Sequence, residues 1–213
     1  MKTKVAAIYG KRDVRLREFE LPKITDNELL VSVISDSVCL STWKAALLGS
    51  EHKRVPDDLE NHPVITGHEC AGIIVEVGKN LTDKYKKGQR FVLQPAMGLP
   101  SGYSAGYSYE YFGGNATYMI IPEVAINLGC VLPYHGSYFA AASLAEPMCC
   151  IIGAYHANYH TTQYVYEHRM GVKPGGNIAL LACAGPMGIG AIDYAIHGGI
   201  QPSRVVVVDI DDK

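Results

Sequence analysis

The stretch VITGHECAGIIVEVG, residues 64–78, is the most informative segment of this chain. It places His68 and Glu69 directly ahead of a run of apolar and β-branched residues that closes on Gly78. A short apolar run bounded by glycine is typical of a buried strand. An imidazole and a carboxylate at the start of such a strand need partners, and these are either ordinary buried hydrogen bonds or a ligand such as a metal ion.

Short strand-like segments surround this stretch, from the N-terminus to about residue 130. They are rich in β-branched residues and separated by Gly, Pro, Asn and Asp, which is typical of a barrel or a sandwich. One segment differs, because Leu40–Gly49 carries apolar residues at helical spacing and ends on a glycine suited to a helix C-cap. We expect a short helix there. The expected strands are KVAAIY, VRLREF, ELLVSVIS, AGIIVEVG, RFVLQP and ATYMIIP.

The pattern becomes helical from about Tyr138, and Pro147 suits the first position of a helix. Residues 175–199 indicate a buried strand, a glycine turn and a helix, and a second strand, Val205–Val208, follows. This is the first strand-helix-strand unit of a doubly wound α/β sheet, of which it makes up about a third at most. We therefore expect two parts, a β-rich domain and an incomplete α/β domain, in a chain that looks truncated.

Composition narrows the classes of partner. The chain has 213 residues, of which 48% are hydrophobic and 19% charged, and its formal net charge is -2. With Lys and Arg scattered along it, the chain has no electrostatic reason to bind nucleic acid or an anionic membrane. The first apolar run breaks at Gly10, too early for the core of a signal peptide or a spanning helix. We expect a cytoplasmic protein with no nucleic-acid or membrane partner.

A glycine turn near the C-terminus predicts a dinucleotide site. In dinucleotide folds such a turn lets the backbone approach a pyrophosphate, and an acid that ends the next strand binds the ribose hydroxyls. Because that acid disfavours a 2′-phosphate, NAD is favoured over NADP. The alternative is a turn that only packs a helix against a strand, and Cys183 stands where the first glycine is usual. The predicted cofactor residues are Gly185, Pro186, Met187, Gly188 and Asp209.

Two further residues extend the possible metal site beyond the opening stretch. Cys39 ends an expected strand, and Glu146 lies where the β-rich part gives way to helices. Thiolate, imidazole and carboxylate together with His68 make the set typical of catalytic zinc, with one position left for water or substrate. A structural zinc would instead be closed by four ligands. Spacing alone leaves open the alternative that His68 is an ordinary buried histidine.

Several motifs occur in an order known from one family. They are GHECAGIIVEVG, KKGQRFV, the C-x-S of Cys39–Ser41, the EP of Glu146–Pro147 and the glycine turn at Gly185. In these motifs, and over nearly its whole length, the chain resembles the zinc-dependent medium-chain alcohol and polyol dehydrogenases. The resemblance implies a GroES-like zinc-binding catalytic domain, a partly open barrel, over residues 1–152. It implies the beginning of a Rossmann domain over residues 153–213.

The resemblance also implies roles for particular residues. Cys39 and His68 would bind one catalytic zinc, and Glu69 would be a displaceable or second carboxylate. Ser41 would relay the proton. Glu146 matches the carboxylate that polyol-type members use near the metal.

A narrower resemblance points to a substrate class. The stretches DSVCLSTWKAALLG, EHKRVPDD, GYSYEYFGGNATYMIIP, SLAEPM and GAYHANYHTT are similar to those of the L-sorbose-1-phosphate reductase group. This implies reduction of L-sorbose 1-phosphate to D-glucitol 6-phosphate. We expect a homo-oligomer at full length. Because residues 95–122 contain no cysteine, the structural zinc of the wider family is expected to be absent.

Cations near the predicted metal ligands are candidates for a phosphate contact. Lys44 lies five residues after Cys39 and is the preferred candidate. Lys53 and Arg54 are more readily interpreted as solvated charges, since the two aspartates at residues 57 and 58 follow them closely.

Three alternatives remain open. The chain is another polyol or alcohol dehydrogenase of the same family; or it is a zinc-free relative of the quinone reductases, which would leave Cys39, His68 and Glu146 without a reason to occur together. The third is a folded but inactive fragment. Because most of a Rossmann sheet is missing, we expect the isolated chain to bind NAD weakly and to turn over no substrate.

Overall fold

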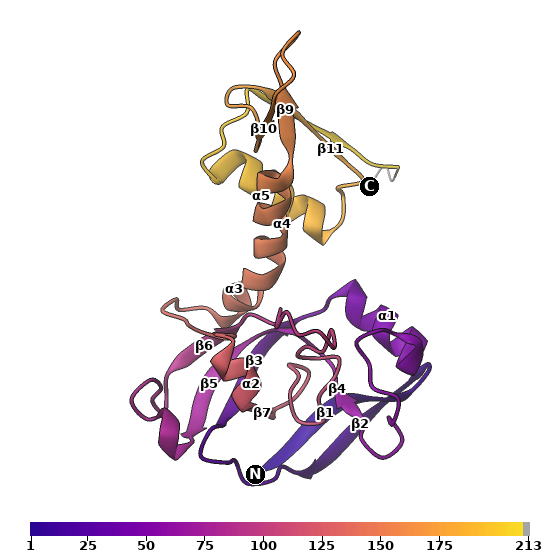
Figure 1. Cartoon of the computed structure of the whole chain (residues 1–213), viewed down its shortest axis with the longest axis vertical. Coiled ribbons are helices and arrows are strands. Elements are labelled where there is room, and N and C mark those ends of the chain that lie inside the picture. The colour runs from indigo at the N-terminus through magenta and orange to yellow at the C-terminus, as the bar shows by residue number, and fades with distance from the viewer. Residues whose placement is uncertain (211–213) are drawn as a thin grey trace. The chain divides into compact units, whose positions relative to one another are not determined.

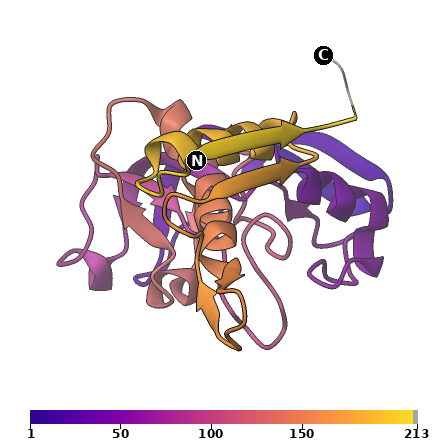
Figure 2. The ribbon, with the colours of Figure 1, turned by 90° about the horizontal axis from the view of Figure 1, so that it is seen from above.

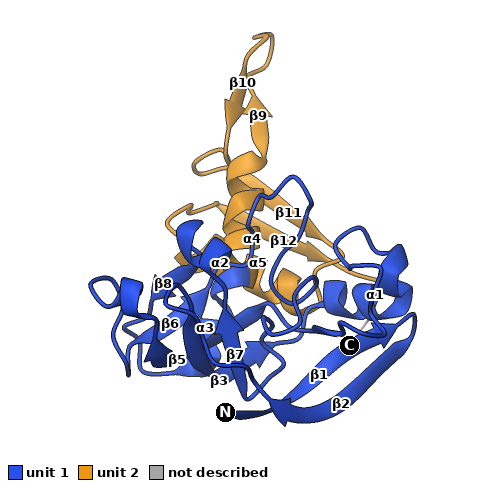
Figure 3. Cartoon of the chain, turned by 60° about the horizontal axis from the view of Figure 1, so that its bottom comes forward, with its two compact units in different colours: residues 1–146 blue, residues 147–213 orange. Residues whose placement is uncertain are grey.

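The computed structural model describes residues 1–210, which form two compact units. Unit 1 comprises residues 1–146 and unit 2 begins at Pro147 (Figures 1 and 3). The boundary expected after residue 152 falls inside helix α4 (Ala145–Ala157), and the assignment of domains about it stays a prediction. None of the described helices has the length and apolar character needed to cross a bilayer.

Unit 1 is built from two antiparallel sheets. The larger sheet has the strand order β7-β3-β5-β6-β8, and the smaller has the order β2-β1-β4. Because the described strands of unit 1 form two sheets and no closed barrel, the expected β-rich, partly open fold is confirmed. All six predicted strands are present. The strands of unit 1 are β1 (Lys2–Gly10), β2 (Asp13–Glu20), β3 (Leu29–Ser37), β4 (Val64–Ile65), β5 (Glu69–Val77), β6 (Arg90–Leu93), β7 (Tyr118–Ile121) and β8 (Val131–Pro133).

The predicted helix after β3 is confirmed as α1 (Leu40–Leu48). Gly49 caps it with a φ of 54°, a conformation that glycine adopts without the penalty of a Cβ. Ala45 is the buried residue of this helix, whereas Trp43 is 60% exposed. The other helical segments of unit 1 are η1 (Gly49–Glu51), η2 (Lys79–Leu81), α2 (Glu123–Asn127) and α3 (Phe139–Ser143).

The ladder between β3 and β5 brings two distant parts of the sequence together. Three of its apolar residues, Leu29, Val31 and Ile74, are fully buried in the main core of unit 1. Two register shifts interrupt the ladder, which then ends on the pairs Asp36 with Cys70 and Ser37 with Glu69. The core therefore gives way to polar side chains at one end of this strand pair.

Unit 2 contains the predicted strand-helix-strand unit. Strand β11 (Asn177–Leu181) is followed by α5 (Pro186–His197) and by β12 (Arg204–Val208). The two strands pair in parallel, and Figure 2 shows their arrows side by side and pointing the same way. This part of the fold is therefore as expected from the sequence.

Two details of unit 2 differ from the expectation. Helix α4 begins at Ala145, so Pro147 lies in its first turn and is not its first residue. A short antiparallel hairpin, β9 (Tyr159–Thr161) with β10 (His168–Met170), was not anticipated. Its strands have three residues each, which is too short for an alternating pattern to stand out.

Candidate functional site

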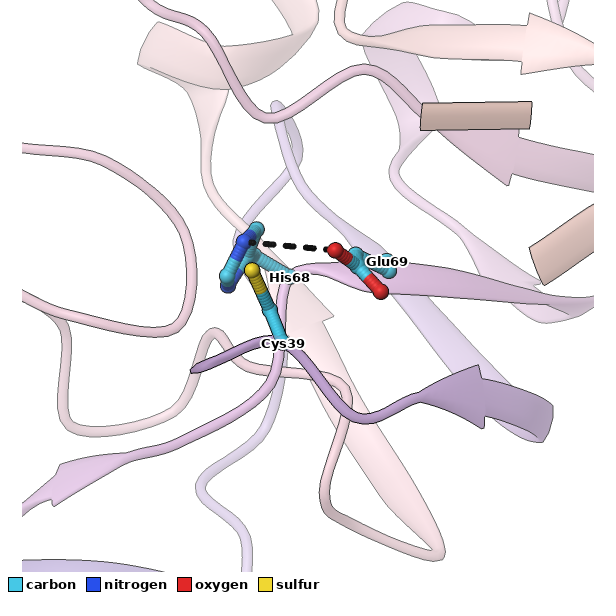
Figure 4. Close-up of side chains that lie close together, drawn as sticks. All are labelled: Cys39, His68 and Glu69. Carbon is cyan, nitrogen blue, oxygen red and sulfur yellow. Dashed lines mark ion pairs between the residues drawn. The ribbon is translucent and has the colours of Figure 1, made fainter. Parts of the chain in front are cut away.

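Three donor side chains converge at the end of the β3–β5 ladder. Cys39 occupies the N-cap of α1, two residues after β3, and His68 immediately precedes Glu69, the first residue of β5. Because the ladder ends on the pair Ser37 and Glu69, the chain beyond β3 runs beside His68. One ligand atom from each of the three residues lies within 4.8 Å of the other two (Figure 4).

The donor set fits a zinc ion. Thiol, imidazole and carboxylate are the usual zinc ligands, and His68 and Glu69 are each only 5% exposed. His68 Nε2 lies 3.9 Å from Glu69 Oε1, the pair joined by the dashed line in Figure 4. The other ring nitrogen, Nδ1, is buried and has no hydrogen-bond partner among the described residues, although buried polar atoms are nearly always bonded. The His68 imidazole therefore has a ring nitrogen without a hydrogen-bond partner, and the ring lies beside a thiol and a carboxylate.

Burial sets the protonation of these ligands. It lowers the pKa of His68, an effect that the neighbouring Glu69 opposes, and a neutral imidazole is the form that binds a metal. Burial also raises the pKa of the Cys39 thiol. A thiol that stays protonated in the metal-free site releases its proton when a metal binds.

A chain of hydroxyl groups leads away from Cys39. Ser41 Oγ donates a hydrogen bond to Cys39 Sγ at 2.9 Å, and the Tyr107 hydroxyl lies 2.6 Å from Ser41 Oγ. The same hydroxyl lies 3.4 Å from His68 Nε2. Because Ser41 uses its one hydroxyl proton on Cys39, the Tyr107 hydroxyl is the donor of their hydrogen bond; burial also raises the pKa of Tyr107. The predicted relay serine therefore has a defined partner on each side.

The Tyr107 ring is itself held between side chains of the loop after α1. It stacks on His52 with ring centroids 5.7 Å apart and an interplanar angle of 10°. The Arg54 guanidinium carbon lies 5.0 Å from its centroid. Sequence reasoning missed Tyr107 and His52, because Tyr107 lies in a loop with several other tyrosines and carries no motif.

A further carboxylate, that of Asp36, holds the backbone of Glu69 in place. Asp36 accepts hydrogen bonds from the Glu69 backbone N–H at 3.0 Å and from Asn115 Nδ2 at 2.6 Å. The pKa of Asp36 is raised to about 7, mainly because the carboxyl group is buried. Ser37 Oγ donates a hydrogen bond to the Glu69 carboxylate, so both the backbone and the side chain of Glu69 are held. Asp36 was also missed, although an acid at the end of an otherwise apolar strand is a signal that a buried partner exists.

Two predicted residues lie outside the group of three. Glu146, in the first turn of α4, is not among the ligand atoms that gather within 4.8 Å of one another. It lies close enough for its charge to raise the pKa of Tyr107, so it borders the site. Lys44 is exposed on α1, and its charge lowers the pKa of His52. The ligand role of Glu146 and the phosphate role of Lys44 stay predictions.

The predicted dinucleotide turn joins β11 to α5. Gly185 is the N-cap of α5 and offers no capping side chain, so the first N–H groups of the helix remain available to an anion. A Cβ on Gly188 would lie 2.1 Å from the Cys183 carbonyl oxygen, so only glycine fits this approach of helix to strand. Asp209 Oδ2 accepts a hydrogen bond from the Ala184 N–H at 2.7 Å. The acid thus lies at the turn, as a dinucleotide site requires.

Cys183 does not obstruct this turn. Its side chain is 4% exposed, and its thiol donates to the Leu180 carbonyl oxygen at 3.0 Å. The side chain that replaces the usual first glycine therefore points into the unit. Pro186 and Met187 form the first turn of α5, and Met187 is 49% exposed.

Comparison with known proteins identifies relatives of this chain. Residues 25–130 match the alcohol dehydrogenase GroES-like domain. The chain is 72% identical over 210 residues to a mannitol-1-phosphate 5-dehydrogenase of Aliivibrio fischeri, covering 99% of this chain and 50% of that protein. It is 46% identical over 208 residues to an L-sorbose 1-phosphate reductase of Klebsiella pneumoniae, covering 97% and 51%. The chain thus spans about half the length of the curated relatives it matches.

A solved structure shares the fold. The 2R,3R-butanediol dehydrogenase from Bacillus subtilis superposes with a TM-score of 0.72 at 20% identity, covering 99% of this chain and 64% of that chain. A likeness at this identity concerns the fold alone. The domain match and the two curated relatives show that the chain carries an alcohol dehydrogenase GroES-like domain and corresponds to a portion of the polyol dehydrogenases it matches.

Proposed function

We propose that the chain carries the metal and proton-transfer site of a zinc-dependent dehydrogenase. The enzyme moves a hydride between a nicotinamide and a polyol phosphate or sugar phosphate. The observation that carries this proposal is the convergence of Cys39, His68 and Glu69 beside the hydroxyl of Ser41. The names of the two curated relatives support the substrate class, since both act on phosphorylated six-carbon compounds.

The residues that would hold the metal are Cys39, His68 and Glu69, with Glu146 as a further carboxylate nearby. When bound there, Zn²⁺ supplies a Lewis acid that favours the alkoxide form of the substrate alcohol and polarises the ketone. We propose one catalytic zinc per chain and no structural zinc. The absence of cysteine from residues 95–122 supports this count.

Ser41 is the proposed proton carrier. In the direction of alcohol oxidation, its Oγ accepts the proton that the substrate hydroxyl loses and passes its own hydroxyl proton on toward solvent, and in reduction both transfers run in reverse. Tyr107 holds the Ser41 hydroxyl through the 2.6 Å contact, which fixes the direction in which Ser41 can donate and accept. Tyr107 is therefore a positioning residue, because it acts on the substrate only through Ser41.

We propose NAD as the cofactor, bound at the turn Gly185–Gly188 with Asp209 at the adenosine ribose. The open N–H groups at the start of α5 suit a pyrophosphate. A carboxylate at the ribose repels a 2′-phosphate, which favours NAD over NADP.

The proposed function is tested by a substrate panel on the native protein that carries this sequence, loaded with zinc. NAD reduction is followed with mannitol 1-phosphate, D-glucitol 6-phosphate, mannitol and glucitol, and NADH oxidation with L-sorbose 1-phosphate. We expect the phosphorylated compounds to give the higher kcat/KM. A protein that binds zinc and NAD but oxidises none of these alcohols would rule the proposal out.

Replacing Tyr107 by Phe should lower kcat by up to about tenfold, the equivalent of one lost hydrogen bond, and leave the zinc content unchanged. KM for the polyol phosphate should change little, because the variant disturbs only the orientation of Ser41. Steady-state kinetics with elemental analysis measures both. Tyr109→Phe is the matched control, since the Tyr109 ring packs on Phe112 at 5.8 Å. Loss of zinc in Tyr107→Phe, or an unchanged kcat, would contradict the positioning role.

Replacing Asp209 by Ser should weaken NAD binding and reduce the preference over NADP. The carboxylate makes charge-assisted hydrogen bonds to ribose hydroxyls in this proposal, and one such bond corresponds to roughly tenfold or more in affinity. The measurement is kcat/KM for NAD and NADP in the native protein. Asp193→Ser, which removes an exposed acid paired with His197 on α5, is the control. An unchanged ratio of the two cofactors in Asp209→Ser would contradict the ribose contact.

A further inference from the structure

Arg54 has a fixed place beside the site. Its backbone carbonyl accepts a hydrogen bond from Ser108 Oγ at 2.6 Å, and its N–H donates to His52 Nδ1 at 3.3 Å. The next residue, Val55, is 5% exposed in a core cluster with Tyr107. The main chain at Arg54 is therefore anchored on both sides, and the half-buried side chain lies over the Tyr107 ring.

This guanidinium lacks a carboxylate partner. No acid of the described residues lies within ion-pair distance of Arg54, and the two aspartates that follow it do not neutralise it. Asp58 instead contacts His62 at 3.9 Å and accepts a hydrogen bond from Asn61 at 2.8 Å. A partly buried arginine is ordinarily paired with a carboxylate or a phosphate. Its donors thus remain available for an anion that comes from outside the chain.

The charge of Arg54 reaches the candidate site. It contributes to lowering the pKa of His52, whose ring stacks on Tyr107. Lys44 and Lys53 also lower the pKa of His52. The side of the site around His52 is consequently positive, whereas the candidate metal ligands themselves include carboxylates.

The N–H groups of the Arg54 guanidinium are free to bind an anion. Arginine carries five such groups in one plane, and the hydrogen bonds of Arg54 to described residues are made by its backbone. That plane is the one in which arginine binds two oxygens of a phosphate. Tyr107 contacts both Arg54 and His68, with its centroid 4.9 Å from that of the imidazole. An anion at Arg54 would therefore lie one tyrosine ring away from the candidate metal ligands.

We propose that Arg54 binds the phosphate group of the substrate and sets the preference for phosphorylated over unphosphorylated polyols. This proposal rests on the proposed function, because it assumes a polyol phosphate as substrate. It names Arg54 in place of Lys44 as the main contact. The separation of Arg54 from the ligands by the Tyr107 ring suits a substrate whose phosphate lies several carbons from the reacting carbon.

The test compares Arg54→Met with Arg17→Met in the native protein. Arg17 is a matched control, because its guanidinium carbon also lies over a tyrosine, 5.4 Å from the Tyr9 centroid, on strand β2. In Arg54→Met, kcat/KM for mannitol 1-phosphate should fall roughly tenfold to a hundredfold, and the loss on mannitol should be much smaller. Arg54→Lys should retain part of the preference. Equal losses on the two substrates, or no loss, would overturn the proposal.

Two further measurements separate this proposal from its alternatives. If Arg54→Met raises KM for NAD and leaves the parameters for mannitol 1-phosphate unchanged, Arg54 serves a cofactor phosphate and the proposal fails. If the wild-type protein oxidises no phosphorylated polyol, the proposed function fails first. Binding of inorganic phosphate, followed by ³¹P NMR, then decides on Arg54 alone: binding that is lost in Arg54→Met and kept in Arg17→Met supports an anion site there. Binding that is absent, or equal in both variants, overturns it.

Discussion

Replacing Cys39 by Ser together with His68 by Ala should reduce bound zinc from one per chain to a small fraction of that. Both substitutions remove ligand atoms from a group that spans no more than 4.8 Å, and carboxylates without the thiolate and imidazole should not retain zinc through dialysis. Activity should fall on the order of a thousandfold, since Lewis-acid stabilisation amounts to several kcal/mol. Elemental analysis after dialysis and steady-state rates measure the two effects.

The matched control for this experiment changes the same residue types elsewhere. Cys149→Ser with His156→Ala alters two residues of α4, neither of which belongs to the group of potential metal ligands. Zinc content should stay at one per chain in this control. Two zincs per wild-type chain, or an undiminished zinc content in the Cys39 and His68 double variant, would contradict the single catalytic site.

Replacing Gly67 by Ala should destabilise unit 1 by more than about 3 kcal/mol. Gly67 has a φ of 88°, and an added Cβ would lie 2.1 Å from Asp36 Oδ2 and 2.5 Å from the Asn115 backbone nitrogen. Neither neighbour can retreat easily, because the Asp36 carboxylate is bonded to Asn115 and to the Glu69 backbone. The substitution therefore adds a steric clash to left-handed strain. Urea unfolding measures the loss.

Gly88→Ala separates these two contributions. Gly88 has a similar φ of 84°, but an added Cβ would meet nothing within 4 Å. Only the left-handed strain applies there, about 1 to 2 kcal/mol. A clear excess loss in Gly67→Ala is thus expected from crowding at the site. Equal losses in the two variants would show that the backbone at Gly67 relaxes freely.

The strands and the α/β unit were predictable because their signals are local. Alternating or continuous apolar runs identified β3 and β5, and the glycine turn with Asp209 identified β11, α5 and β12. The sheet order and the β9–β10 hairpin were not, since pairing between distant strands depends on tertiary packing. The start of α4 was misplaced by two residues, because Pro147 is tolerated anywhere in the first turn of a helix.

In the site, too, residues within a sequence motif were predicted, and residues that act through their surroundings were not. Cys39, His68 and Glu69 were chosen for their chemistry, and the structure brings these three together. Tyr107 and Asp36 act through burial and through contacts with residues far away in sequence, which no spacing rule encodes. Arg54 was interpreted as a solvated charge because acids follow it closely, yet neither acid pairs with it, and Asp58 contacts His62 and Asn61 instead. Whether an acid neutralises a nearby arginine depends on where the two side chains point, and proximity in the sequence does not determine that.

The β3–β5 ladder also sets an order of events for the metal. Cys39 and His68 meet only after the long loop between them has closed, and loop closure costs chain entropy before any contact compensates for it. Pairing of two nine-residue strands provides that compensation, so zinc should enter a site that has already folded. Opening of the last pairs of the ladder, Ser37 with Glu69 and Asp36 with Cys70, would move Cys39 away from His68 and Glu69. We therefore expect fraying of this strand end to speed the release of a bound metal.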